Sequence, residues 1–329
     1  MGHGRTPRDA SRRGGPDLAR RAGRRGRSLS DDGSPMDDLT LIDLDQPRRG
    51  YRKFISCWLR RRGGEAYVVD PGPASTIPHL TSELRRLGVT RLDRILLTHI
   101  HLDHGGGAGH LAAAFPEARV VVWEEAARHL VDPQRLWEGS LQVLRDLAPL
   151  FGRPLPLPAD RIDPPSSLTP LGIRTFHTPG HAPHHQCYLD DGTLFVGEAA
   201  GMTCPTRGGA PYLRPATPPR FHLPTALRSL DLLLALEPAP ARLAWGHHGL
   251  NSEPARFLGA AREQLLTWTA TLDGLRATHG PAWTPQLQAA ALRRLADVDP
   301  WFATFADLED DLREREADFL RNTLEGMLG

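Results

Sequence analysis

The chain has 329 residues, and its 40 basic and 39 acidic side chains give a formal charge of +1, which argues against a general binder of polyanions. Hydrophobic residues make up 40 %, as in globular proteins with a buried core, and no stretch approaches the roughly 20 apolar residues of a membrane span. Three scattered cysteines exclude a disulfide framework and favour a cytoplasmic location. The 15 histidines are the feature that remains to be explained.

The first 35 residues differ in composition from the rest of the chain. Nine Arg and four Asp give them a net charge of +5, which leaves −4 for residues 36–329. Such a segment has almost no large apolar side chain to bury, so we expect residues 1–35 to form a disordered tail. A nucleic-acid-binding arm is one alternative, and a true start of the protein at Met36 is another.

From residue 52 onward, short apolar runs alternate with stretches of helical spacing. The predicted strands, in chain order, are residues 54–59, 66–69, 94–97, 120–123, 173–176, 186–189, 193–196 and 243–245. Helices are predicted over residues 77–87 and 225–236. Because strands alternate with helices but hairpins also occur, we expect an α/β (α+β) fold with a mixed sheet and outer helices.

After Gly249 the pattern is helical throughout. Apolar residues recur at alternating steps of three and four from Leu258 to Leu275, and the last helix carries a stripe from Phe305 to Phe319. We therefore predict three parts: the tail 1–35, a main domain 36–253 and a helical C-terminal subdomain 254–329. The apolar stripe either packs on the protein's own sheet or meets a substrate or the second subunit of a homodimer.

The run His99-x-His101-x-Asp103-His104 follows the predicted strand 94–97 directly. Three imidazoles and a carboxylate within six residues would crowd if merely packed, and a bound dication explains them better. His99 and His101 point to one side as alternate residues, and the turn offers Asp103 and His104 to a neighbouring position. Six residues on one loop cannot surround a metal, so further ligands must come from elsewhere.

Three further loops supply candidate ligands. His181, Glu198 and the pair His247-His248 each follow a predicted strand and lie next to a glycine, which lets the backbone turn tightly beside a site. We expect these loops to complete the ligand set.

These motifs resemble the metallo-β-lactamase superfamily of αββα hydrolases, in particular its glyoxalase II-like thioesterases and its lactonases. The matching segments, in the family's order, are residues 70–72, 98–106, 178–185, 194–198 and 246–247. The resemblance implies a four-layer αββα sandwich, which the helical subdomain follows here.

The resemblance also implies a dinuclear metal site, most simply with two zinc ions and otherwise with iron or manganese. One ion would be held by His99, His101 and His181, and the other by Asp103, His104 and His247. Asp103 would also be the catalytic residue that holds the attacking water and takes its proton. Asp70 would lie behind the site, and His185 would support the ligands.

Glu198 stands where the family usually has Asp. Its longer side chain could bridge both ions or bind only one. Alternatively Glu198 is no ligand, and the site holds a single metal.

Candidate substrate contacts lie in the segment 203–219, which follows Glu198. Tyr212 could donate a hydrogen bond to an oxyanion, and Arg207 and Arg214 could pair with a substrate carboxylate or phosphate. The alternative is that all three are ordinary residues of a proline-rich loop.

The leading functional hypothesis is hydrolysis of a small ester, thioester or lactone, with no nucleic-acid or membrane partner. Phosphodiester cleavage by a nuclease of the same superfamily is a second hypothesis, which the charge of −4 disfavours. A mononuclear iron dioxygenase that acts on persulfides is a third, which Glu198 keeps open.

Overall fold

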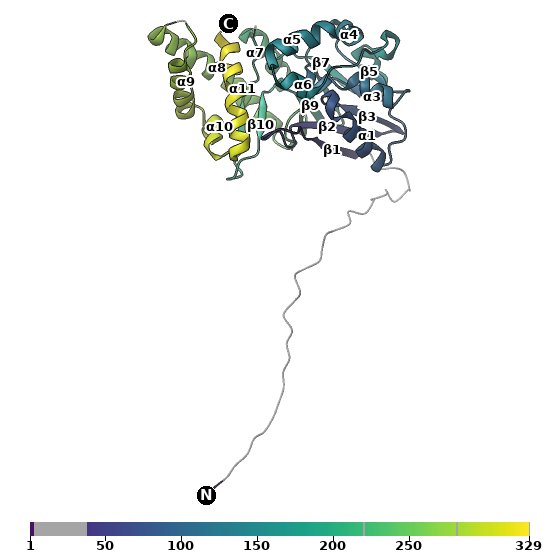
Figure 1. Cartoon of the computed structure of the whole chain (residues 1–329), viewed down its shortest axis with the longest axis horizontal. Coiled ribbons are helices and arrows are strands. Elements are labelled where there is room, and N and C mark those ends of the chain that lie inside the picture. Colours follow the sequence, from purple (N-terminus) through teal and green to yellow (C-terminus); the bar gives the residue numbers. More distant parts are fainter. Residues whose placement is uncertain (3–37, 220, 281, 329) are drawn as a thin grey trace. The chain divides into compact units, whose positions relative to one another are not determined.

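Two mixed β-sheets form the centre of the fold (Figure 1). The six-stranded sheet has the order β1 (Asp38–Leu44), β2 (Ile55–Arg62), β3 (Glu65–Val69), β4 (Arg94–Leu96), β5 (Arg119–Val121) and β6 (Ile162–Asp163). The five-stranded sheet has the order β13 (Leu250–Asn251), β12 (Arg242–Trp245), β9 (Thr193–Gly197), β8 (Gln186–Asp190) and β7 (Arg174–His177). Strands β3 to β6 are parallel neighbours, as are β9 and β12, whereas the other pairs within these two sheets are antiparallel.

Alternation along the strands determines where the core lies. In β3, Tyr67 and Val69 face the other sheet, while Val68 faces the helices outside. In β9, Phe195 faces inward and Leu194 outward in the same way. Because side chains along a strand point alternately to opposite faces, each sheet contributes one face to the layer between the sheets and one to an outer layer.

Helices cover both outer faces. Helices α1 (Ile77–Arg86), α3 (Ala108–Ala114), α4 (Glu124–Val131) and α6 (Leu147–Phe151) pack on the six-stranded sheet. Helix α7 (Leu223–Leu234) and the first half of α8 (Pro254–His279) pack on the five-stranded sheet. The predicted four-layer αββα arrangement is therefore confirmed.

The C-terminal helices form a further apolar cluster. It unites the second half of α8 with α9 (Pro285–Val298), α10 (Pro300–Ala303) and α11 (Asp310–Leu328). A two-stranded sheet of β10 (Met202–Cys204) and β11 (Tyr212–Arg214) packs into the same cluster. The segment 203–219, expected as a proline-rich loop, thus contributes short strands to the packing of the C-terminal helices.

The remaining elements are short, with one exception. They are α2 (Leu102–Gly105), the longer α5 (Gln134–Leu144), and 3₁₀ helices at Ala74–Thr76, Ala159–Arg161, Pro165–Leu171 and Thr304–Asp307. The computed structural model describes residues 1–2, 38–219, 221–280 and 282–328, so nearly all of the predicted tail, and the alternative start at Met36, lie outside the described residues. Residues from 38 onward belong to one compact unit. None of the helices described is long and apolar enough to cross a membrane.

Candidate metal centre

Four strands from the two sheets lead directly into the loops of the site. Asp70 follows β3 and His99 lies shortly after its parallel neighbour β4. Glu198 follows β9, and His247 lies shortly after its parallel neighbour β12. The carboxyl ends of parallel neighbours lie at the same edge of a sheet, so the topology itself gathers these polar residues.

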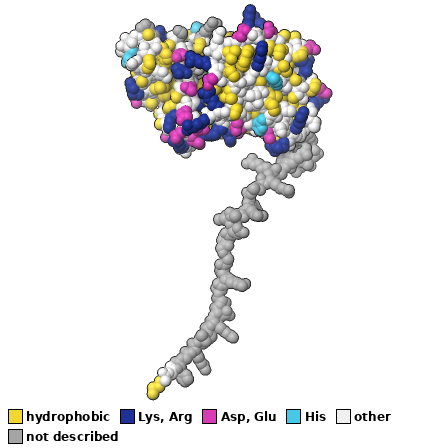
Figure 2. All heavy atoms as spheres, viewed as in Figure 1, with side chains coloured by type: hydrophobic (Ala, Val, Ile, Leu, Met, Phe, Trp, Pro, Cys, Tyr) yellow, Lys and Arg dark blue, Asp and Glu magenta, His cyan; other side chains and the backbone are white. Residues whose placement is uncertain are grey.

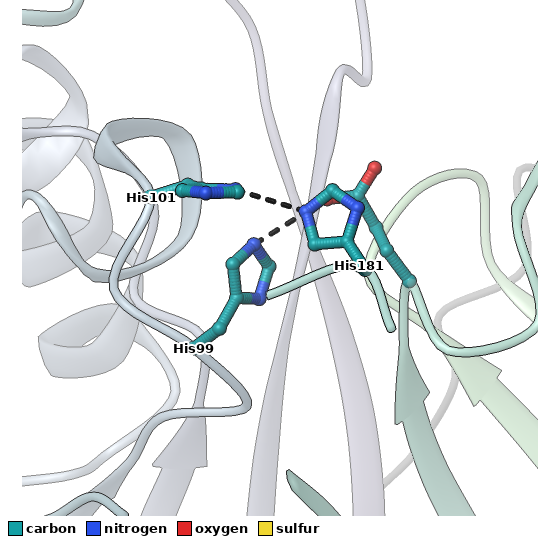
Figure 3. A group of neighbouring side chains, drawn as sticks. His99, His101 and His181 are labelled. Atoms are coloured by element: carbon teal, nitrogen blue, oxygen red, sulfur yellow. Dashed lines mark hydrogen bonds and ion pairs between the residues drawn. The ribbon is translucent and has the colours of Figure 1, made fainter. Parts of the chain in front are cut away.

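The structure brings all seven predicted ligands together in two groups. The first group is His99, His101, His181 and Glu198, and the second is Asp103, His104 and His247. Within each group, one ligand atom per residue lies within 4.8 Å of the others. Figure 3 shows the imidazoles of His99 and His101, from one loop, and of His181, from another, converging on one point.

The Glu198 carboxylate lies between the two groups. Its Oε2 is 2.8 Å from His181 Nε2 and 3.5 Å from His104 Nε2. Its Oε1 is 3.6 Å from His247 Nε2. The longer side chain thus reaches both groups from the position where the family usually has Asp.

The far ring nitrogens of three ligands are held by groups that can only accept a hydrogen bond. His247 Nδ1 is 2.6 Å from the Phe54 carbonyl, and His181 Nδ1 is 3.0 Å from the Ala216 carbonyl. His104 Nδ1 is 3.0 Å from Asp70 Oδ2. Each Nδ1 therefore carries the proton, and in the neutral ring the Nε2 lone pair points into the site.

The resulting contacts fit a metal better than a hydrogen-bonded core. His104 Nε2 and His247 Nε2 are 3.2 Å apart, which is a hydrogen bond when His104 is protonated but a pair of facing lone pairs when both rings are neutral, as metal binding requires. The buried His99 Nε2 makes no hydrogen bond among the described residues, and Glu198 Oε2 lies 3.4 Å from it. A cation between such nitrogens removes the repulsion and supplies the missing partner, and imidazole with carboxylate is a donor set that Zn²⁺ accepts.

Asp70 holds the start of the loop after β4, which carries the candidate ligands from His99 to His104. Its carboxylate accepts hydrogen bonds from Thr98 N (2.8 Å) and Thr98 Oγ1 (2.7 Å) as well as from His104. Because the Thr98 hydroxyl donates to Asp70, its oxygen is free to accept from His99 Nδ1 at 3.0 Å. Sequence reasoning missed Thr98, although its place directly before His99 was a usable signal.

His185 supports a candidate ligand, Glu198, through its backbone. Its Nε2 accepts a hydrogen bond from the backbone N–H of Glu198 at 3.2 Å, and its Nδ1 is 2.8 Å from Thr178 Oγ1. In the structure it therefore orients the backbone of Glu198 rather than a ligating imidazole.

Two glycines are needed because ligand loops pass close to one another. A Cβ on Gly246 would lie 2.7 Å from His104 Cε1. A Cβ on Gly197 would lie 2.6 Å from His185 Nε2, and Gly197 has a φ of +52°, which side chains disfavour. Both positions exclude any larger residue without displacement of the site.

The metal-free site combines an ionised carboxylate with two kinds of imidazole. Although burial opposes it, Asp103 raises the pKa of His104 well above the ordinary value, and Glu198 raises that of His181. Burial lowers the pKa of His99 and His101 well below the ordinary value. Burial alone would raise the pKa of Glu198, but the neighbouring His181 and His104 outweigh it and lower that pKa strongly. A metal ion requires neutral imidazoles beside the ionised carboxylate, so its binding would displace the protons that His104 and His181 hold in the metal-free site.

The three expected substrate contacts are engaged elsewhere. Tyr212 is fully buried against Phe302 and Phe305, with ring centroids at 6.2 and 6.1 Å. Arg207 pairs with Asp310 at 2.8 Å on the surface, and Arg214 forms a buried ion pair with Glu316. The prediction is wrong for Tyr212 and Arg214, which are buried in the packing of α11 and its neighbours, whereas Arg207 is half exposed beside the start of α11.

Comparison with known proteins shows the family of this chain. The family model of the metallo-beta-lactamase superfamily matches residues 50–247. The chain belongs to the metallo-β-lactamase superfamily.

The similar proteins and solved structures share only a modest sequence identity with this chain. It is 31 % identical over 192 residues to a metallo-beta-lactamase fold-containing protein of Sulfurisphaera tokodaii, covering 54 % of this chain and 67 % of that protein. It is 31 % identical over 252 residues to the hydroxyacylglutathione hydrolase of Acidiphilium cryptum, covering 73 % of this chain and 88 % of that protein. The crystal structure of an archaeal superfamily protein from Sulfolobus tokodaii aligns with a TM-score of 0.63 at 21 % identity, over 89 % of this chain and 99 % of that one.

Proposed function

We propose that the protein is a metal-dependent hydrolase with two metal ions, most simply zinc, and that it cleaves a small ester, thioester or lactone. The observation that carries this proposal is the pair of ligand groups with Glu198 reaching both. Distant relatives named hydroxyacylglutathione hydrolase support a thioester as the bond that is cleaved.

The chemistry divides between the metals and the chain. Two bound ions would lower the pKa of a shared water and polarise the carbonyl that it attacks. Asp103, whose side chain is 17 % exposed, would hold the attacking water and accept its proton. His104, His181 and His247 would keep their Nε2 atoms aimed inward through the acceptors at their Nδ1 atoms.

The experiment that tests this proposal combines metal analysis with a substrate panel. We expect about two zinc ions per chain in the purified protein, together with turnover of thioester or lactone substrates. One iron with oxygen uptake in the presence of a persulfide would overturn the proposal in favour of the dioxygenase. Cleavage of a phosphodiester chromophore without any acyl substrate would overturn it in favour of the nuclease.

Variants separate catalysis from folding in the same panel. We expect Asp103→Asn and His101→Ala to abolish turnover while circular dichroism stays unchanged. Arg207→Ala is the control, because Arg207 forms a half-exposed ion pair with Asp310 on the surface. Full activity in either of the first two variants would contradict the assignment.

The cytoplasmic location and the absence of a nucleic-acid or membrane partner belong to the same proposal. Cys57, Cys187 and Cys204 are buried and free, which supports a reducing compartment. A homodimer through the C-terminal helices stays a proposal as well, and sedimentation of the purified protein tests it.

A further inference from the structure

Helix α11 binds the loop of residues 45–54, which joins β1 to β2, through ion pairs and a hydrogen bond. Arg52 pairs with Asp311 at 3.0 Å, and Arg49 pairs with Glu314 at 2.9 Å. Arg315 Nη1 donates a hydrogen bond to the Gly50 carbonyl at 2.8 Å. Figure 2 shows the mixed basic and acidic side chains that gather over this part of the surface.

Phe54, at the end of this loop, lies between α11 and the metal site. Its ring stacks with Phe319 of α11 at 6.1 Å, and the Arg315 guanidinium lies 5.3 Å from the ring centre. The same ring is 4.9 Å from the imidazole of His247, and Tyr51 at 4.8 Å and Phe151 at 6.0 Å complete its aromatic surroundings. One aromatic side chain thus separates the C-terminal helix from a predicted metal ligand.

The backbone around Phe54 also determines where His247 lies. The Phe54 carbonyl accepts the hydrogen bond from His247 Nδ1, and Ser56 N donates to the Gly246 carbonyl at 2.9 Å. Gly249 N donates to Ser56 Oγ at 3.0 Å. The loop around His247 is therefore tied to residues 54–56, and a shift of Phe54 would rotate or displace the imidazole.

We propose that Phe319 of α11 is a positioning residue for the second metal position, the group of Asp103, His104 and His247. Phe319 holds Phe54, and Phe54 in turn holds His247 in the ring orientation that metal binding needs. Helix α11 reaches the first group mainly through other side chains: Thr217 Oγ1, next to the Ala216 carbonyl that holds His181 Nδ1, donates to the Thr323 carbonyl of α11 at 2.9 Å. Phe319 meets that segment at the Arg214 guanidinium, 5.5 Å away, which the Glu316 carboxylate also holds. Helix α11 lies outside residues 50–247, which match the family model. The inference rests on the metal binding in the proposed function.

Titration of the metal-free full chain with Co²⁺ or Zn²⁺ alone tests this inference. We expect two binding steps in the natural chain, with separate visible absorption changes for Co²⁺. In Phe319→Ala one of the two steps, that of the second metal position, should lose roughly 10- to 100-fold in affinity, while the other step keeps its affinity. A loss of this size is usual when a residue that supports a metal ligand is removed. Phe319→Tyr keeps the ring and should restore both steps.

Phe305→Ala is the matched control. Phe305 is also a partly buried phenylalanine of the C-terminal segment, but its ring contacts Tyr212 and Phe302 rather than Phe54. Equal weakening of both steps in Phe319→Ala, no weakening, or the same selective loss in Phe305→Ala would overturn the inference. A natural chain with a single step would overturn it too. Two steps with a selective loss support it even if no ester is hydrolysed, which separates its outcome from that of the proposed function.

Discussion

Asp70 shows how much of the candidate centre depends on a single residue. Its φ of +51° is a conformation that Asp tolerates better than most residues, and its carboxylate bonds to both Thr98 and His104. The side chain is almost completely buried, so each oxygen relies on these partners rather than on water. One carboxylate thus orders the ligand loop and orients a ligating ring.

We expect Asp70→Asn to bind metal roughly 10- to 100-fold more weakly at the position that includes His104. The amide keeps the size of the side chain but loses the charge that favours His104 Nδ1–H as a donor. Competition with a chromophoric chelator measures the affinity, and circular dichroism checks the fold. An unchanged affinity would show that Asp70 does not orient His104.

The second prediction at the scale of single residues concerns Glu198. Because its carboxylate lies against ligands of both groups, Glu198→Gln should weaken both metal positions, whereas a carboxylate bound to one ion would affect one position only. Metal stoichiometry after dialysis against a fixed low zinc concentration distinguishes the two results. Loss at a single position would contradict the bridging role.

At the scale of elements, the strands were predictable because their alternation is a property of adjacent residues. The eight predicted strands correspond to β2–β5, β7–β9 and β12, with ends displaced by up to three residues. Strand β1, beside the tail, was missed, as were the short strands β6, β10, β11 and β13. The apolar pattern predicts Phe305 in the last helix, but extended backbone at Leu308, with a ψ of 148°, separates its 3₁₀ turn from α11.

The candidate site, like the strands, could be predicted from the sequence only in part. Ligand side chains at strand ends leave a pattern in the sequence, as the run from His99 to His104 shows. The carbonyls of Phe54 and Ala216 leave none, because every residue has a carbonyl and only the tertiary fold brings these two to a histidine. For the same reason, sequence could not show that Arg214 faces Glu316 across 102 residues of chain.

Helix α11 carries a buried charge whose effect on stability depends on pH. Glu316 is completely buried between Arg214 and Arg315. Burial raises the pKa of Glu316, but the two guanidinium groups outweigh it and lower that pKa below the ordinary value. The ionised carboxylate therefore stabilises the fold above the unfolded pKa of about 4.3, and this contribution is lost as pH falls through the lower folded pKa.

We expect Glu316→Gln to lower the free energy of unfolding by about 3 kcal/mol near pH 7, because it leaves two buried guanidinium groups without a counter-charge. The difference from the natural chain should shrink once the pH falls below about 4. Urea unfolding of the metal-free proteins at several pH values measures it. Glu314→Gln, which removes a surface partner of Arg49, is the control and should cost less than about 1 kcal/mol. A difference that does not vary with pH would contradict the assignment.

At the scale of the whole molecule, the candidate metal centre joins the two sheets. His99, His101, Asp103 and His104 come from the loop after β4 of the six-stranded sheet, whereas Glu198 and His247 follow strands of the five-stranded sheet. Metal ions bound there would connect the two halves of the sandwich. Without them, the junction would depend on weaker contacts among the same side chains, such as His104 Nε2 with His247 Nε2 at 3.2 Å and Glu198 with His181 at 2.8 Å.

Metal removal should therefore lower the stability of the entire fold. A ligand present at about 1,000 times its dissociation constant stabilises the native state by roughly 4 kcal/mol. We expect chelation to lower the thermal midpoint of unfolding clearly and added zinc to restore it. His104→Ala is the comparison, since its midpoint should respond much less to chelator. Equal midpoints with and without metal in the natural chain would contradict this role.

The contact between Arg315 and Gly50 joins residues 265 positions apart in the chain. Contacts of such separation form slowly, because the entropy of closing a long loop must be overcome before they give any stabilisation. The sequence distance from His99 to His181 and Glu198 is much shorter. The contacts by which α11 secures the loop 45–54, and with it His247, should therefore form after those between segments that lie nearer in the chain.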